Sequence, residues 1–352
     1  MSRAATARQY TSVGMAIAEA PKSADIVQTP VDRLIRLVAD DMAATDRLIH
    51  ARAGSSITLI PDLARHLIDS GGKRLRPLLT LAAARICGYG GDLHVNLAAA
   101  VEFIHTATLL HDDVVDASSL RRGKIAANIL WGNKPSILVG DFLFSRAFQL
   151  MVEAGSLRVL DILATAATVI AEGEVLQLRS ANNLATTEAD YLKVVSAKTA
   201  ALFAAASEAG ATIASAKPEI AEAFHTYGQN LGIAFQLVDD ALDYSGRQGE
   251  MGKSVGDDFR EAKVTLPVIL ALDRADDEAR SFWHRVIVSG VQQEGDLKHA
   301  IHYVEDTGAI RETRARASRY ADEACSALDV LPSSPLRQAL IDVAEFCVGR
   351  GY

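Results

Sequence analysis

Two aspartate clusters in this sequence have the spacing of a metal site. In the first, within VEFIHTATLLHDDVVDASSLRR, Asp112 and Asp116 are four residues apart, so on an α-helix their carboxylates project from one face, one turn apart. His105, seven residues before Asp112, falls on the same face. Most other residues of the stretch are apolar or small, and carboxylates on such a surface repel each other and are costly to desolvate. A bound cation is the simplest compensation.

The second cluster, in FQLVDDALDY, repeats this arrangement at Asp239 and Asp243, with Asp240 beside them. Oxygen ligands without a cysteine or histidine cage suit a hard cation, and a few carboxylates that leave room for water and phosphate suit Mg²⁺. A single cluster of this kind would more often be a solvated acidic face. Two of them on apolar helices, with basic motifs nearby, instead predict a metal site that binds phosphates.

Basic residues accompany these clusters. The segment GGKRLRP, residues 71–77, precedes a predicted helix, and such a loop combines cationic side chains with backbone N–H groups in an anion site. Arg121 and Arg122 follow the first cluster, where they either pair with the aspartates or bind the same phosphates as the metal. Lys198, beside Thr199 in an apolar helix, either extends to solvent or holds an anion inside the bundle.

Composition narrows the class of protein. The chain has 352 residues, 49% of them hydrophobic, and a formal net charge of −8, which argues against a nucleic-acid partner. Its three cysteines have no metal-ligand spacing and indicate reduced thiols in a cytoplasmic compartment. No apolar run reaches the roughly 18 residues of a membrane span. We find no segment with strand periodicity, so we expect a single all-α domain.

The predicted domain spans residues 30–352. Residues 1–29 are small, slightly basic and poor in acids, and we expect a disordered tail there, with a transit peptide as the alternative. Gly173 is expected to permit a close helix crossing. The predicted helices cover residues 30–50, 61–70, 96–118, 136–151, 157–179, 187–210 and 218–244, with two more beginning at Pro77 and Pro267.

Together these features indicate the chemistry. Divalent ions held by the carboxylates would bridge a diphosphate, and the arginines and lysines would neutralise its remaining charge. The apolar helices would line a pocket for a hydrocarbon attached to that diphosphate. Nothing in the sequence indicates a nucleophilic triad. The simplest reaction for such a site is ionisation of an allylic diphosphate.

The motif set resembles that of the trans (E-type) polyprenyl diphosphate synthases. GGKRLRP, HDDVVDASSLRRG, Lys198-Thr199, FQLVDDALDY and GKSVGDDFREAKVTLP follow the family's order over roughly residues 30–352. The similarity is greatest to bacterial members that make octaprenyl to decaprenyl diphosphate for quinone side chains. It implies an all-α isoprenoid synthase-type helical bundle around a central active-site cavity, usually in a homodimer. It also implies repeated condensation of isopentenyl diphosphate onto farnesyl or geranylgeranyl diphosphate, to a product of about C40–C50.

The resemblance also implies a role for individual residues. Mg²⁺ would be ligated by Asp112, Asp116 and Asp239, supported by Asp113, Asp240 and Asp243. The diphosphate of isopentenyl diphosphate would be bound by Lys73, Arg76, His105 and Arg122. The allylic diphosphate would be held by Arg121, Lys198, Lys253 and Lys263, with Thr199 and Gln236. The residues acting on the reacting centre would be Lys198, Thr199 and Gln236, the last two presenting their dipoles to the developing cation.

Product length depends on the space below the first cluster. Thr108 and Ala107 lie four and five residues before Asp112, one turn down the helix. In short-chain relatives bulky aromatic residues block the tunnel there, so these small side chains predict a long product. From Asp112 back to Leu97 the helix offers about 22 Å of wall. Met151 and Leu163 are candidates for its floor.

Three other functions are compatible with parts of the sequence. A non-catalytic subunit of a heteromeric synthase should have lost parts of the acidic motifs, and both are intact. A metal-dependent phosphohydrolase would use His111 with Asp112 and further histidines, but would leave the second cluster unexplained. A terpene cyclase would need no site for isopentenyl diphosphate, whereas GGKRLRP and His105 supply one.

Overall fold

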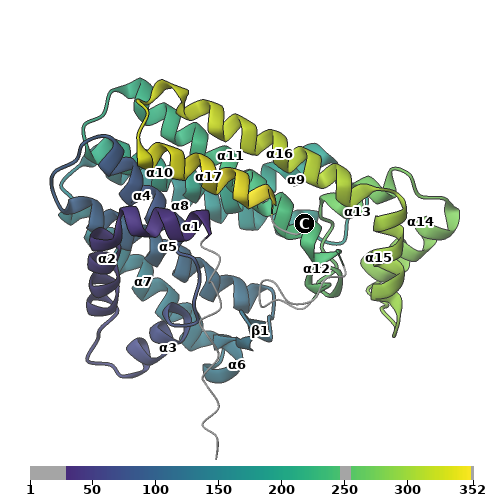
Figure 1. Ribbon diagram of the computed structural model, residues 1–352. Helices are drawn as coiled ribbons and strands as arrows, with labels where there is room; N and C mark the ends of the chain where they lie inside the picture. Colours follow the sequence, from purple (N-terminus) through teal and green to yellow (C-terminus); the bar gives the residue numbers. More distant parts are fainter. Residues whose placement is uncertain (1–28, 246–254, 350–352) are drawn as a thin grey trace, which may run out of the picture.

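The computed structural model describes residues 29–245 and 255–349, and this part of the chain is almost entirely helical (Figure 1). The predicted all-α class is confirmed. One two-stranded antiparallel hairpin, in which Leu120 pairs with Ile125, follows the first aspartate cluster. The elements before and including it are α1 (Pro30–Leu37), α2 (Ala39–Arg52), α3 (Leu59–Ile68), α4 (Leu75–Ile86), α5 (Leu93–Val115), β1 (Leu120–Arg121) and β2 (Lys124–Ile125).

The rest of the described chain continues as helices. The middle part consists of α6 (Ala127–Trp131), α7 (Asn133–Glu153), α8 (Leu157–Ser180), α9 (Glu188–Val195), the π-helix η1 (Ser196–Ala200), α10 (Ala201–Ile213) and α11 (Pro218–Asp243). The last part consists of α12 (Asp257–Arg260), α13 (Leu266–Leu272), α14 (Asp277–Trp283), the π-helix η2 (His284–Val288), α15 (Asp296–Asp306), α16 (Ala309–Ala327), the 3₁₀-helix η3 (Leu328–Val330) and α17 (Pro335–Gly349).

Two predicted helices differ from the structure. The helix expected over residues 30–50 is interrupted at Val38, a buried residue with non-helical backbone angles between α1 and α2. The helix expected from Thr187 contains the π-turn η1 in its middle. Thr187 caps it as predicted, because its hydroxyl accepts a hydrogen bond from the backbone N–H of Asp190. Neither interruption has a local sequence signal such as proline.

The long helices pack around α5 and α11, which carry the two aspartate clusters. α5 packs mainly against α7, and α11 lies between α10 and α16, as Figure 1 shows for α11 and α16. By length and composition α5 could cross a membrane, but 72% of its apolar window is buried inside the bundle. It is therefore a core helix of this fold.

η1 packs between α8 and α11, and each of these helices has a glycine at its contact with η1. A Cβ atom at Gly173 of α8 would lie 2.8 Å from Ala197 Cβ, and one at Gly232 of α11 would lie 2.6 Å from Ala200 Cα. The predicted close crossing at Gly173 is confirmed. Because both neighbours approach at backbone distance, the position of η1, and of Lys198 and Thr199 within it, is fixed from two sides.

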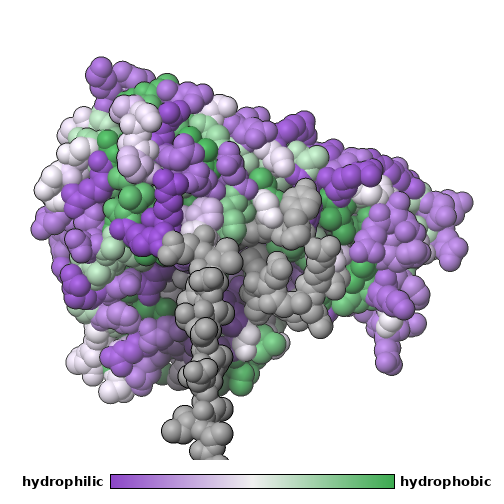
Figure 2. Space-filling model, viewed as in Figure 1, coloured by the Kyte–Doolittle hydropathy of each residue, from purple (hydrophilic) through white to green (hydrophobic). Residues whose placement is uncertain are grey.

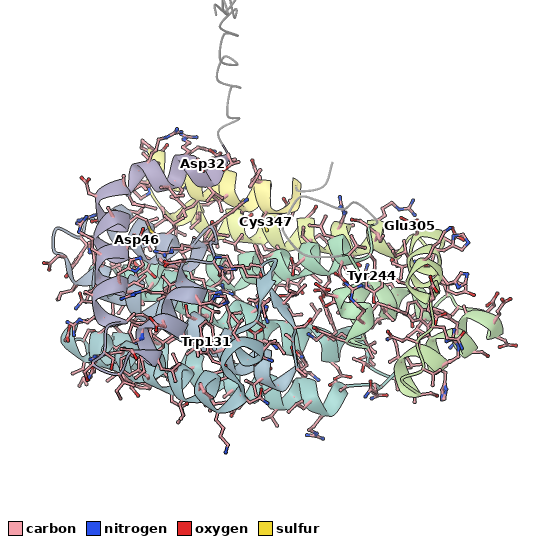
Figure 3. All side chains as sticks on the ribbon, turned by 90° about the horizontal axis from the view of Figure 1, so that it is seen from below. Asp32, Asp46, Trp131, Tyr244, Glu305 and Cys347 are labelled. Atoms are coloured by element: carbon pink, nitrogen blue, oxygen red, sulfur yellow. The ribbon has the colours of Figure 1, made fainter. Side chains whose placement is uncertain are left out.

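The helices α13, α14 and α15 form a lobe beside the main bundle (Figure 1). In Figure 1, α13, α14 and α15 lie on the right, and α12 lies where the lobe meets the bundle. Tyr244, labelled in Figure 3, lies near this junction. The face shown in Figure 2 is mostly hydrophilic, with apolar residues gathered at its lower end near α6.

Candidate active site

A cavity of about 700 Å³ contains residues from both aspartate clusters. Asp116 borders it from the end of α5, and Asp240 borders it from α11. Lys198 on η1 and Lys263, after α12, also line it. The structure therefore brings together acidic and basic groups that are far apart in the sequence. A second hollow of about 770 Å³, between α8 and α10 on another side of η1, contains none of the predicted site residues.

Lys198 lies between two carboxylates. Its Nζ is 3.6 Å from Asp112 Oδ2 and 2.8 Å from Glu174 Oε1. Burial, and then the proximity of these two carboxylates to each other, raise the pKa of Glu174. Burial likewise raises the pKa of Asp112, which Lys198 opposes. These groups are partly desolvated, and an additional cation among them would be stabilised.

Lys263 extends to the other end of the first cluster. Its Nζ lies 3.2 Å from Asp116 Oδ2 and 2.5 Å from Glu261 Oε2. Burial lowers the pKa of Lys263, but Asp116 and Glu261 raise it by more than burial lowers it. The net pKa is therefore above the usual value, and the ammonium stays charged. The segment after the second cluster thus supplies a cation to the first.

Asp113 has a different environment from its two neighbours. Its side chain is fully buried, and Oδ1 accepts hydrogen bonds from Arg121 Nε and Nη2, at 2.8 and 2.5 Å. Asn128 Nδ2 donates to its backbone carbonyl at 2.9 Å. Asp113 therefore ties the β1–β2 hairpin and α6 to the end of α5. This placement fits a supporting role for Asp113. Because the guanidinium of Arg121 is bound to Asp113, its contact with the allylic diphosphate stays a prediction.

The three aspartates of the second cluster also differ from one another. Asp239 is partly exposed on α11, whereas Asp240 is buried. The carboxylate of Asp243 accepts hydrogen bonds from the backbone N–H groups of Gly256, Asp257 and Asp258, at 3.2, 3.1 and 3.0 Å. Asp243 therefore holds the start of α12, and with it the segment that leads to Lys263.

Thr199 and Gln236 meet in the same cavity. The Thr199 hydroxyl donates to Gln236 Oε1 at 2.9 Å, and Gln236 Nε2 donates to Asp240 Oδ1 at 2.7 Å. The hydroxyl of Tyr191 donates to the other oxygen, Asp240 Oδ2, at 2.5 Å. Burial and the adjacent Asp240 keep the pKa of Tyr191 well above its usual value, so the phenol is protonated.

A separate cluster of basic residues lies where α4, α5 and the β1–β2 hairpin meet. Arg76 Nη1 lies 3.3 Å from His105 Nε2, and a Cβ atom at Gly72 would touch the guanidinium of Arg122. Burial lowers the pKa of Arg76 to about 10, and burial together with Arg76 and Arg122 lowers the pKa of His105 well below 6.5. His105 is therefore neutral between two permanent cations. Glu102 acts on both arginines, and an anion such as a diphosphate would offset more of their positive charge.

The remaining predicted site residues have these positions. Lys73 is exposed and its Nζ lies 5.2 Å from the centre of the Phe346 ring. Lys253 lies outside the described residues. Ala107 is fully buried in the same apolar cluster as Met151 and Leu163, and Thr108 is half-buried, with its hydroxyl donating to the His105 carbonyl.

The donor set fits a hard divalent cation that is completed by a substrate. Among residues 29–245 and 255–349, no three carboxylate, imidazole or thiol groups converge closely enough to hold an ion by themselves. Mg²⁺ is commonly bound by one or two carboxylates together with phosphate oxygens and water. Asp112 and Asp116, with Asp239 on the other helix, have the oxygen chemistry for this arrangement.

Comparisons with known proteins agree with this geometry. Residues 57–304 match the family model described as polyprenyl synthetase. The chain belongs to the polyprenyl synthetase family. It is 44% identical to the octaprenyl diphosphate synthase of Escherichia coli, over 91% of this chain and 99% of that protein.

Solved structures give the same result. A polyprenyl synthase from Caulobacter crescentus, in complex with calcium and isoprenyl diphosphate, superposes with a TM-score of 0.89 at 54% identity, covering 92% of this chain and 98% of that one. A decaprenyl diphosphate synthase from Rhodobacter capsulatus superposes with a TM-score of 0.87 at 57% identity, covering 91% and 99%. The fold is therefore that of the all-α isoprenoid synthases, and the chain is a polyprenyl diphosphate synthase, a prenyltransferase.

Sequence analysis missed two side chains at the site. Glu174 received no role, although it lies beside Gly173, where α8 comes closest to η1. Tyr191 was not singled out, although it is seven residues before Lys198 and so two turns away on a similar face. The spacing of each residue relative to a motif was the available signal.

Proposed function

We propose that this prenyltransferase condenses isopentenyl diphosphate repeatedly onto an allylic diphosphate, farnesyl or geranylgeranyl diphosphate, to give an all-trans product of about C40–C50 for quinone side chains. The observation that carries the proposal is the single cavity lined by Asp116, Asp240, Lys198 and Lys263. Such a cavity has the groups needed to bind and ionise a diphosphate ester, and we propose the basic cluster of Arg76, His105 and Arg122 for the other substrate.

We propose Mg²⁺ as the cofactor, held by Asp112, Asp116 and Asp239. When bound, it would neutralise charge on the leaving diphosphate. Lys198 and Lys263 have carboxylate partners at 2.5 to 3.6 Å. In the loaded site each lysine would share its ammonium between these carboxylates and the diphosphate oxygens, which orients the C1–O bond of the allylic substrate.

The reaction then forms one C–C bond and breaks one C–O bond. The diphosphate leaves C1 of the allylic group with the bonding pair, and the double bond of isopentenyl diphosphate supplies the pair for the new bond. A proton is lost from isopentenyl C2 to the departed diphosphate. Thr199 and Gln236 line the same cavity, and in this proposal their oxygen dipoles would stabilise the positive charge on the allylic group.

The cluster of Arg76, His105 and Arg122 would bind the diphosphate of isopentenyl diphosphate, together with Lys73. Support comes from the excess of positive charge in this cluster, because the neutral imidazole of His105 lies beside two arginines. Among the described residues, Glu102 is the carboxyl that acts on both arginines, and burial raises its own pKa. A diphosphate would supply the missing negative charge.

The assembly and location of the protein are further parts of the proposal. Large apolar side chains of α7 and α8 are exposed, and we propose that a second copy of the chain covers them in a homodimer: Ile137, Leu138, Phe148, Val152 and Val175. Free thiols at Cys87, Cys325 and Cys347 fit a reducing, cytoplasmic compartment. We propose residues 30–352 as one catalytic domain, preceded by a tail whose residues 1–28 lie outside the described structure.

The test is to incubate the pure protein with Mg²⁺, farnesyl diphosphate and labelled isopentenyl diphosphate, and to separate the dephosphorylated products by chain length. A discrete band of about forty to fifty carbons is expected. A band of fifteen or twenty carbons would leave the chemistry intact and contradict the product length. No incorporation by folded protein would favour a non-catalytic subunit, and phosphate release from nucleotides would favour a phosphohydrolase.

A further inference from the structure

Tyr191 is connected to the reacting centre by an unbroken chain of hydrogen bonds. Tyr191 is 7% exposed, and Asp240, whose carboxylate accepts its hydrogen bond, is 3% exposed. The O–H donates to Asp240 Oδ2 at 2.5 Å, while Asp240 Oδ1 accepts from Gln236 Nε2 at 2.7 Å. Both oxygens of Asp240 are therefore engaged in positioning neighbours within the protein.

The chemistry of these groups fixes the direction of every proton in the chain. An ionised carboxylate can only accept, so the NH₂ of the Gln236 amide must face Asp240. The amide oxygen then faces Thr199, and because that oxygen can only accept, the Thr199 hydroxyl must donate to it, at 2.9 Å. With its proton turned toward Gln236, the oxygen of Thr199 keeps its lone pairs for the cavity.

We propose that Tyr191 is a positioning residue for prenyl transfer: through Asp240 and Gln236 it holds the Thr199 hydroxyl with its oxygen lone pairs toward the reacting allylic carbon. This role rests on the proposed function, because it matters only if positive charge develops at that carbon. Without the phenol, Asp240 Oδ2 loses the donor that Tyr191 supplies, and the carboxylate is held less firmly in its orientation. The Gln236 amide can then turn over, and the Thr199 proton can point at the cation instead of away from it.

The structure offers a matched control for the loss of this hydroxyl. Tyr244, at the end of α11, is also fully buried, but its hydroxyl has no hydrogen-bond partner among the described residues. Tyr244→Phe removes the same atom from a similarly packed ring without breaking the chain to Thr199. A difference between the two variants therefore reports on the hydrogen-bond chain, not on packing.

The first measurement is the single-turnover rate of one condensation, from farnesyl diphosphate and isopentenyl diphosphate with Mg²⁺. Tyr191→Phe should lower this rate on the order of tenfold, because preorganised dipoles act on the transition state, while both KM values stay within about twofold of wild type. Tyr244→Phe should keep the wild-type rate. Thermal unfolding of each variant checks that it is folded.

The deciding measurement is a double-mutant cycle with Thr199→Val. If Tyr191 acts through the Thr199 hydroxyl, adding Tyr191→Phe to Thr199→Val should cause no further loss, whereas independent effects would multiply. Thr199→Ser, which keeps the hydroxyl, should restore the sensitivity to Tyr191→Phe. Multiplicative losses, or a Tyr191→Phe variant with the wild-type rate, would overturn the role of Tyr191 and leave the proposed function standing. Folded wild-type protein that performs no condensation would overturn the proposed function and this role with it.

Discussion

Lys263 Nζ lies 3.2 Å from Asp116 Oδ2, so the segment that follows the second aspartate cluster reaches the first. The two residues are 147 positions apart in the sequence. Asp243 stabilises the other end of this segment through the backbone of α12. The two clusters are thus joined through a short piece of chain, and a diphosphate bound between them would contact both.

Replacing Lys263 should weaken binding of the allylic diphosphate. Lys263→Met removes a charged donor and leaves Asp116 with one fewer counter-charge, so we expect KM for farnesyl diphosphate to rise about 10- to 100-fold, as for loss of a charge-assisted hydrogen bond. KM for isopentenyl diphosphate should change little. Initial-rate kinetics measure both. Lys298→Met, at an exposed lysine of α15, is the control; equal changes in both variants would contradict the assignment.

The structure predicts different consequences for two aspartates of the second cluster. Asp239→Ala should lower turnover by about a hundredfold or more at saturating Mg²⁺, since the variant lacks a proposed metal ligand. Asp243→Asn keeps one acceptor oxygen for the backbone of α12, so it should act chiefly on stability and on KM for the allylic substrate. Turnover measured against Mg²⁺ concentration distinguishes them. A large rightward shift of the Mg²⁺ curve in Asp243→Asn would mean that Asp243 is itself a ligand.

The elements that carry the motifs could be predicted from sequence because their spacing and apolar periodicity are local properties. The spacing of Asp112 and Asp116 predicts a helix, and the structure places Asp112 in the last turn of α5 and Asp116 at its C-cap. The partners of these residues could not be predicted. Whether Lys198 extends to solvent or into the bundle depends on Glu174, which α8 brings to it, and on Gly173, which lets α8 come so close.

The backbone around the cations was also beyond prediction. Arg74 and Arg122 adopt positive φ angles, of 46° and 52°, which non-glycine residues adopt only when the surrounding structure holds them there. The π-turn at Lys198 and Thr199 has no local sequence signal, and such turns are frequent at functional sites. These features result from tertiary packing, which single-sequence patterns do not contain.

His105 should make the stability of the ligand-free protein depend on pH. Its folded-state pKa lies well below the 6.5 of an unperturbed imidazole, because it is buried between Arg76 and Arg122. Below pH 6.5 the unfolded chain takes up a proton that the folded protein does not, so the free energy of unfolding should fall as pH falls, by up to about 1.4 kcal/mol per pH unit. Above that pH this contribution is constant.

The measurement is urea unfolding between pH 5 and pH 8 in the absence of diphosphates. His105→Gln should show a shallower loss of stability toward pH 5, because the titrating group is gone. His302→Gln, at an exposed histidine of α15, should keep the wild-type slope. The same slope in His105→Gln and wild type would contradict a buried, neutral His105.

Ala107→Phe should shorten the product while leaving condensation active. Ala107 has no exposed surface and packs in the same cluster as Met151 and Leu163, so an aromatic ring there would occupy the space that we propose for the growing chain. Overpacking should also lower stability by about 1–3 kcal/mol, which unfolding experiments can measure separately. Ala43→Phe, at an exposed alanine of α2, adds the same ring away from the cluster and should leave product length unchanged. Chromatography of dephosphorylated products decides: if folded Ala107→Phe makes the wild-type length, the wall of the tunnel does not lie at Ala107.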